Sequence, residues 1–186
     1  NEQDAAQGRQ IAVVIPAYKA AATLPAVVAA IGAEVDLVVV VDDACPEHSH
    51  ESLAAVTDPR LVIVRHSINQ GVGGAFLSGM AEALRRGAQV IVKVDSDGQM
   101  DPALIPAFVQ PIRDGRADYV KGNRFYFLSH ARGMPKVRLG GNLALSFLTK
   151  LSTGYWDLMD PTNGYFAIHG EVAALLDPDR LSKRFF

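Results

Sequence analysis

The sequence lacks the features that several large protein classes require. Its single cysteine, Cys45, cannot form an internal disulfide, which excludes a disulfide-stapled scaffold and fits a reducing compartment. No apolar run approaches the roughly 18 residues of a membrane-spanning helix. The polar tail at residues 1–10 has no apolar core of a secretion signal. We therefore expect a cytoplasmic protein with no segment here that spans a membrane by itself.

Excess charge of one sign is also absent from the sequence. The 186 residues carry 18 basic and 20 acidic side chains, for a net charge of -2 and a pI near 6.2. This balance argues against a nucleic-acid partner. Apolar residues make up 49% of the chain, which is ordinary for a globular protein and enough for the core of one domain.

Short runs of β-branched residues alternate with stretches rich in alanine and leucine. The runs predict strands at residues 11–15, 37–41, 61–64, 90–94 and 119–121. The stretches predict helices at residues 24–31, 47–56, 72–86, 102–114 and about 137–151. Strands separated by helices of this length form parallel sheets. We therefore expect an α/β fold with a Rossmann-like, doubly wound and mainly parallel sheet.

Polar side chains follow the predicted strands, at the sheet edge where open α/β folds bind ligands. Asp95 and Asp97 are two residues apart and project to the same side, and Gln99 follows one step later. Carboxylate pairs of this kind hold Mg²⁺ or Mn²⁺ shared with a substrate phosphate. A polar turn after a strand explains the same pair without a metal, so both interpretations stand.

Two further motifs after strands also allow two interpretations. Asp42 and Asp43 end an apolar strand, where a carboxylate can bind a nucleoside or cap a helix. The glycines at positions 71, 73 and 74 fail the dinucleotide fingerprint, because Phe76 stands where glycine or alanine is needed, and no P-loop ending is present. We expect Gly74 and Gly79 to let a helix pack closely on the sheet.

Residues 119–156 contain no acidic side chain. Six basic residues in this stretch predict a positive local field: Lys121, Arg124, Arg132, Lys136, Arg138 and Lys150. Apolar residues recur every four positions from Leu139 to Leu151, as in a helix that faces the core, the site or a membrane surface. The segment 157–166, which contains Asp160, leads into another predicted strand and reads equally as a turn or as an acceptor site.

Six motifs in order resemble the family 2 glycosyltransferases of the GT-A fold. The similarity is greatest to the branch of dolichol-phosphate mannose synthase and bacterial polyprenyl-phosphate sugar synthases. The motifs are VVIPAY at 13–18, VVDD at 40–43, NQGVGGA at 69–75, VDSDGQMDP at 94–102, KGNR at 121–124 and DPTNGY at 160–165. Two positions depart from the family pattern: Lys19-Ala20 replaces a common Asn-Glu, and Cys45 replaces a serine. These departures leave the nucleotide open.

The resemblance implies a role for each site residue. Nucleotide-sugar contacts are implied for Pro16, Tyr18, Asp43, Asp95 and Ser96. A divalent ion, Mg²⁺ or Mn²⁺, is implied on Asp95, Asp97 and Gln99. Catalytic or phosphate-facing roles are implied for Asp97, Arg124 and Arg138, and Asp160 is implied at the acceptor side.

The resemblance also implies an activity, the inverting transfer of a sugar from a UDP- or GDP-linked donor to a polyprenyl phosphate. Transfer to a glycan hydroxyl in cell-envelope polysaccharide synthesis, a nucleotidyltransferase and a catalytically silent sugar-nucleotide binding module are the alternatives. We expect residues 11–186 to form a single catalytic domain that stops short of its C-terminal end. We expect this domain to contact the inner face of a membrane peripherally.

Overall fold

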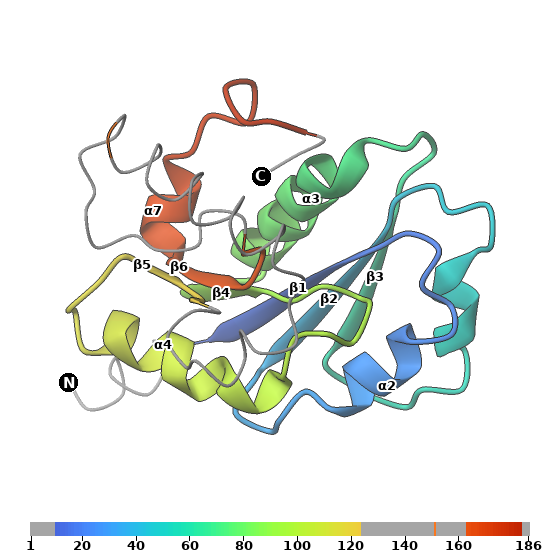
Figure 1. Cartoon of the computed structure of the whole chain (residues 1–186), viewed down its shortest axis with the longest axis horizontal. Helices are drawn as coiled ribbons and strands as arrows, with labels where there is room; N and C mark the ends of the chain where they lie inside the picture. The colour runs from blue at the N-terminus through green and yellow to red at the C-terminus, as the bar shows by residue number, and fades with distance from the viewer. Residues whose placement is uncertain (1–9, 124–150, 152–162, 184–186) are drawn as a thin grey trace. The chain divides into compact units, whose positions relative to one another are not determined.

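The computed structural model describes residues 10–123, 151 and 163–183 (Figure 1). By its contacts the chain divides into two compact units, Asn1–Val120 with Tyr165–Phe186, and Lys121–Gly164. The predicted helix at about 137–151, except for its last residue, lies outside the described residues, as do the site residues Arg124, Arg138 and Asp160. The single catalytic domain at residues 11–186 stays a prediction.

The core of the first unit is a six-stranded sheet with the strand order β3-β2-β1-β4-β6-β5. Its strands are β1 (Ile11–Ala17), β2 (Leu37–Asp42), β3 (Leu61–Arg65), β4 (Val90–Lys93), β5 (Tyr119–Lys121) and β6 (Phe166–His169). β1 pairs in parallel with both β2 and β4, and β2 pairs in parallel with β3, whereas β6 runs antiparallel to β4. The predicted α/β fold with a mainly parallel sheet is confirmed.

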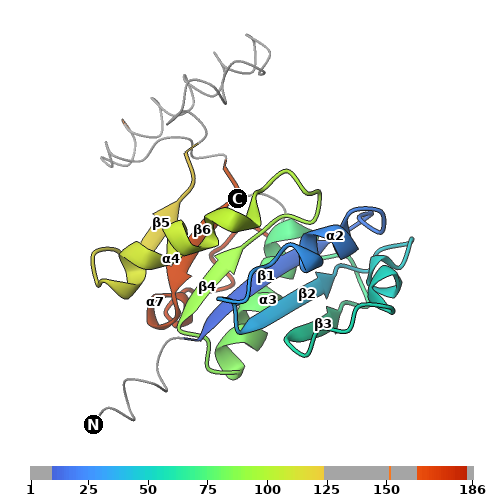
Figure 2. The ribbon, with the colours of Figure 1, turned by 90° about the horizontal axis from the view of Figure 1, so that it is seen from below.

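Helices cover both faces of this sheet (Figure 2). They are α2 (Leu24–Ala29), α3 (Gly71–Arg85), α4 (Ile105–Arg113) and α7 (Gly170–Ala174), with two short 3₁₀ helices, η1 (Ser49–Leu53) and η2 (Pro102–Leu104). α2 and α4 pack on one face, and α3 and α7 pack on the other. Because side chains alternate along a strand, Val13 and Ile15 of β1 enter the first apolar layer, and Ala12 and Val14 enter the second.

The predicted α-helix at residues 47–56 is wrong. Only the 3₁₀ helix η1 forms there, because His48 adopts a left-handed backbone conformation with φ 47° and ψ 54°. The buried Asp42 carboxylate holds the chain in this path, accepting hydrogen bonds from the backbone N–H groups of Cys45 (2.8 Å) and His50 (3.1 Å). An α-helix through this segment would break these hydrogen bonds.

Close packing of α3 on the sheet depends on Gly79. A Cβ at this position would lie 2.4 Å from Val14 Cγ1 and 2.9 Å from Val41 Cγ2. The prediction for Gly79 is therefore confirmed, but the prediction for Gly74 is wrong. A Cβ at Gly74 would meet Gln70 rather than the sheet, and the Gly74 N–H donates to the Lys183 carbonyl oxygen (3.0 Å).

The strand order reverses direction between β1 and β4. From β1 the chain moves outward to β2 and β3, and it then returns across the sheet to β4 on the opposite side of β1. The connections that follow two such neighbouring strands leave in opposite directions, and this leaves a crevice beyond the carboxyl ends of the two strands. The residues that follow β1 and β4 therefore lie together at a position suited to a ligand.

Candidate functional site

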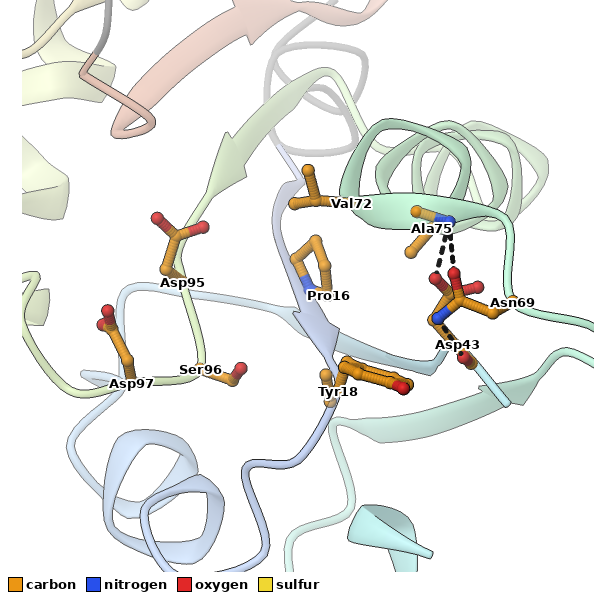
Figure 3. A pocket seen from close by; sticks show the side chains of 11 residues that line it. Pro16, Tyr18, Asp43, Asn69, Val72, Ala75, Asp95, Ser96 and Asp97 are labelled. Carbon is orange, nitrogen blue, oxygen red and sulfur yellow. Dashed lines mark hydrogen bonds between the residues drawn. The ribbon is translucent and has the colours of Figure 1, made fainter. Parts of the chain in front are cut away.

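A cavity of about 460 Å³ opens at this crevice (Figure 3). We call it the strand-end cavity. Its lining residues come from the ends of β1, β2 and β4 and from the start of α3: Pro16, Ala17, Tyr18, Asp43, Asn69, Gly71, Val72, Ala75, Asp95, Ser96 and Asp97. In Figure 3, Asp95 and Asp97 lie across the cavity from Asp43 and Asn69.

The structure gathers most of the described residues that were predicted for the site. Pro16, Tyr18, Asp43 and the Asp95–Asp97 segment all line the strand-end cavity. Gln99 is exposed and is not among the lining residues, so its role as a metal ligand stays a prediction. The start of α3 also contributes to the site, and this contribution was not predicted, although the Asn69-Gln70-Gly71 sequence after the third strand marks its position.

Asp43 is buried at 3% side-chain exposure and organises one wall of the cavity. Its carboxylate accepts hydrogen bonds from the backbone N–H groups of Gln70 and Gly71, both at 2.8 Å. Its Oδ1 also lies 2.7 Å from His66 Nδ1, and His66 Nε2 lies 2.9 Å from Ser78 Oγ. Because a carboxylate has about four acceptor positions, this leaves room for about one more donor.

Two hydrogen bonds to loop backbone shape the acidic side of the cavity, which follows β4. Thr23, the N-cap residue of α2, donates from Oγ1 to the Ser96 carbonyl oxygen at 2.6 Å. Asp97 Oδ1 accepts the Gln99 N–H at 2.9 Å, and Gly98 between them has a φ of 76°, a left-handed conformation that glycine adopts without strain. These bonds hold Asp95 and Asp97 at the cavity although Asp97 itself is exposed.

The carboxylates of Asp95 and Asp97 fit a shared divalent ion. No group of three or more His, Cys, Asp or Glu side chains that could hold a metal occurs among the described residues. Mg²⁺ is commonly bound by one or two carboxylates together with substrate phosphates. The donor set of this cavity therefore fits an ion that binds with a diphosphate.

Tyr18 offers an aromatic surface between the two sides of the cavity. Its side chain is 47% exposed, and the Lys19 ammonium lies 5.7 Å from the centre of its ring. In Figure 3, Tyr18 and Pro16 lie between the acidic loop and Asp43. An exposed ring beside buried hydrogen-bonding groups is suited to stacking against a planar base.

Cys45 and Asp42 are buried, and neither is among the lining residues of the strand-end cavity. Burial would raise the pKa of the Asp42 carboxyl, but hydrogen bonds from Cys45 and His50 hold that pKa below its ordinary value. Burial likewise opposes ionisation of Cys45, whereas hydrogen bonds from Ser49 and Lys19 lower the pKa of its thiol overall. The Cys45 sulfur accepts the Lys19 N–H at 3.1 Å, which ties the turn after Tyr18 to the turn after β2.

Comparison with known proteins places this cavity in a family. The profile of the Glycosyl transferase family 2 matches residues 12–175. A UDP-N-acetylglucosamine–dolichyl-phosphate N-acetylglucosaminyltransferase of Methanococcus voltae is 34% identical over 126 residues, which are 68% of this chain and 50% of that protein. A polyprenol monophosphomannose synthase of Mycolicibacterium smegmatis is 32% identical over 171 residues, which are 89% of this chain and 63% of that protein.

Solved structures have the same fold. Glucosyl-3-phosphoglycerate synthase of Mycobacterium tuberculosis, in complex with Mn²⁺ and UDP-glucose, superposes with a TM-score of 0.68 at 24% identity. The match covers 92% of this chain and 60% of that one. The present chain thus spans about half of the Methanococcus relative and three fifths of the Mycobacterium structure. With its fold, its strand-end cavity and a match over residues 12–175, the chain belongs to glycosyltransferase family 2.

Proposed function

We propose that the protein transfers a sugar, with inversion, from a nucleoside-diphosphate donor to a polyprenyl phosphate. One observation carries the proposal: two carboxylates, an exposed aromatic ring and a buried hydrogen-bonded wall share the strand-end cavity. The names of the Methanococcus and Mycolicibacterium relatives, which specify dolichyl phosphate and polyprenol monophosphomannose, support this acceptor class.

On the donor side, each residue has a distinct task in this proposal. Tyr18 stacks on the base, and the remaining acceptor position of Asp43 takes a hydrogen bond from the nucleoside. Asp95 and Asp97 bind the divalent ion, Mg²⁺ or Mn²⁺, and Ser96 contacts the donor. When bound, that ion supplies positive charge that stabilises the departing diphosphate. The Mycobacterium complex with Mn²⁺ and UDP-glucose supports this choice of ion and of ligand class.

On the acceptor side, the charge of the acceptor decides whether a base is needed. A lipid phosphate is already anionic near neutral pH and attacks without a strong base, whereas a sugar hydroxyl requires one. We propose that Arg124 and Arg138 steer the phosphate and that Asp160 lies at the acceptor side. These residues lie outside the described ranges, and the basic stretch at 119–156 supports their role.

Access to a lipid acceptor also requires a position at a membrane. None of the helices in the described part of the chain has both the length and the apolar character of a membrane crossing. We propose contact with the cytoplasmic membrane surface through the basic, amphipathic stretch around residues 136–152.

The test of the proposed function uses the full-length protein with labelled UDP- and GDP-sugars and Mn²⁺. We expect transfer to undecaprenyl or dolichyl phosphate and none to free sugars or oligosaccharides. Asp97→Asn should abolish transfer and metal-dependent nucleotide binding. Asp101→Asn is the matched control, because Asp101 is exposed nearby and its side chain only caps η2. Transfer to hydroxyl acceptors alone would move the function to glycan synthesis, and binding without turnover would indicate a silent module.

A further inference from the structure

Lys93 is a fully buried cation at the carboxyl end of β4. Only 1% of the residue is exposed, and its ammonium forms an ion pair with Asp95 Oδ1. Its strand neighbours are Val14 of β1 and Phe166 of β6. Side chains alternate along β4, so Lys93 and Ile91 point toward the α3 face of the sheet, into an apolar layer that includes Phe166.

Stability alone does not account for this lysine. Removing an ammonium from water is costly, and a buried ion pair is often no more stabilising than apolar side chains of the same volume. Every other residue of β4 is apolar, as its place in the middle of the sheet requires. One partner of this charge is Asp95, which lines the strand-end cavity, so we expect the role of the lysine there.

The pair changes the charge that the cavity presents to a ligand. Asp95 and Asp97 alone would form a doubly negative site, which attracts any free divalent cation. Lys93 neutralises one of these charges and engages an oxygen of Asp95 that a metal would also use. A free cation is repelled by the lysine. A nucleoside-diphosphate sugar carries about two negative charges, which one divalent ion cancels, so its metal complex is neutral and the lysine does not repel it. A nucleoside diphosphate such as UDP or GDP has an additional charge on its terminal phosphate, so its metal complex is a net anion that the lysine attracts.

We propose that Lys93 is a positioning residue that makes the site select a metal–diphosphate complex over the free metal ion. This inference rests on the proposed donor and metal site and adds a discriminating element to it. Lys93 holds Asp95 in place before the donor binds, and its charge disfavours loading of the site by the ion alone.

The test measures binding and not turnover, with the full-length protein at fixed pH. Free Mn²⁺ is titrated by electron paramagnetic resonance, alone and then with UDP or GDP present. Lys93→Met keeps a side chain of similar length and removes the charge. We expect this variant to bind Mn²⁺ alone about tenfold more tightly, the scale of removing a unit charge beside the same carboxylate. We expect it to bind the Mn²⁺–nucleotide complex less tightly than the wild type.

Controls separate this effect from a general change of charge or fold. Arg85→Met removes one positive charge at the opposite end of α3 from the cavity and should leave both affinities unchanged. Lys93→Gln is neutral and polar, and serves if Lys93→Met does not fold; it should show the same two opposite changes.

Three results would overturn the inference. Unchanged or weaker binding of free Mn²⁺ in both Lys93 variants would show that the lysine does not restrain the ion, with the proposed function intact. If the Lys93 variants bound free Mn²⁺ and the Mn²⁺–nucleotide complex more tightly by the same factor, the lysine would not confer selectivity. Absence of Mn²⁺ binding in the wild type with either nucleotide would overturn the metal site and this inference with it.

Discussion

The carboxylate of Asp43 serves both the cavity and the helix beside it. It accepts the Gln70 and Gly71 N–H groups at the start of α3, where negative charge is also favoured by the helix dipole. The sequence left two interpretations of this residue open, a nucleoside contact and a helix cap. The structure supplies the cap.

We expect Asp43→Asn to lower the free energy of unfolding by about 1–3 kcal/mol without any ligand. The amide can place only one oxygen among three donors, so a buried N–H group loses its acceptor. Urea denaturation measures the change. Asn69→Ala is the comparison. The exposed Asn69 side chain donates a hydrogen bond to the Asp43 carbonyl oxygen, and removing this exposed bond should lower the free energy of unfolding much less. Equal unfolding midpoints for wild type and Asp43→Asn would contradict the capping role.

Some site residues could be predicted and others could not, for a physical reason. Asp95 and Asp97 follow an apolar strand at a spacing that itself indicates a shared direction, so local sequence was enough. Lys93 was overlooked because a lysine at the end of a strand usually reaches solvent. Its burial depends on α3 and β6, which pack over it from distant parts of the sequence.

At the scale of elements, the contact of α3 with the sheet depends on one missing methyl group. Alanine normally favours a helix over glycine by about 1 kcal/mol. At Gly79, however, a Cβ would clash with Val14 and Val41 of the sheet. We expect Gly79→Ala to destabilise the protein by about 1–3 kcal/mol in chemical denaturation, the usual cost of overpacking.

A double-mutant cycle tests the cause of that loss. In a Val14→Ala background, space is available for the new methyl group, so Gly79→Ala should cost clearly less than in the wild type. The same cost in both backgrounds would indicate that the clash with Val14 does not explain the effect.

The other end of α3 carries a pH-dependent ion pair. Hydrogen bonds from Arg85 and Arg86 lower the pKa of Glu82 from 4.5 to about 2. Because the folded pKa is depressed, the ion pair stabilises the protein above the unfolded pKa and is lost as pH falls from about 4.5 toward 2. Glu82→Gln should therefore cost about 0.5–1 kcal/mol at pH 7, since the arginines are solvent-exposed.

Urea unfolding of wild type and Glu82→Gln at several pH values measures this difference. The difference in the free energy of unfolding between wild type and Glu82→Gln should become steadily smaller below pH 4.5. Glu51→Gln, which changes an exposed glutamate in η1, serves as the control. If this difference in the free energy of unfolding did not change with pH, the loss of stability in Glu82→Gln would be due to helix propensity and not to the charge of Glu82.

Strands were easier to predict than the connections between them. β1 and β2 are continuous runs of buried apolar residues, and each predicted strand was found within about two residues of its position. The helix prediction at 47–56 failed because Asp42, which precedes the segment, accepts hydrogen bonds from the backbone N–H groups of Cys45 and His50 and so sets the path of the chain. The residue pattern within 47–56 contains no information about an acceptor that lies outside the segment.

At the scale of the molecule, the strand-end cavity joins segments from four separate parts of the chain. A ligand that binds only the folded state stabilises it by mass action, by about 2.7 kcal/mol at a hundredfold excess over Kd. For a domain of this size we expect Mn²⁺ with UDP or GDP to raise Tm by about 5–10 °C. Mn²⁺ with inorganic phosphate should raise Tm less, and so should the nucleotide with a metal chelator. Equal increases in Tm under all three conditions would contradict a nucleotide site.

The place of β6 in the sheet sets an order of assembly. The four neighbouring strands β3, β2, β1 and β4 are complete once residues up to 93 are available. β5, although it comes next in the chain, borders only β6, which begins at Phe166. During synthesis β5 must therefore wait with unpaired backbone groups until more than forty further residues have emerged. The four-stranded part of the sheet that precedes Tyr18, Asp43 and Asp95 can therefore be built before the last two strands complete the sheet.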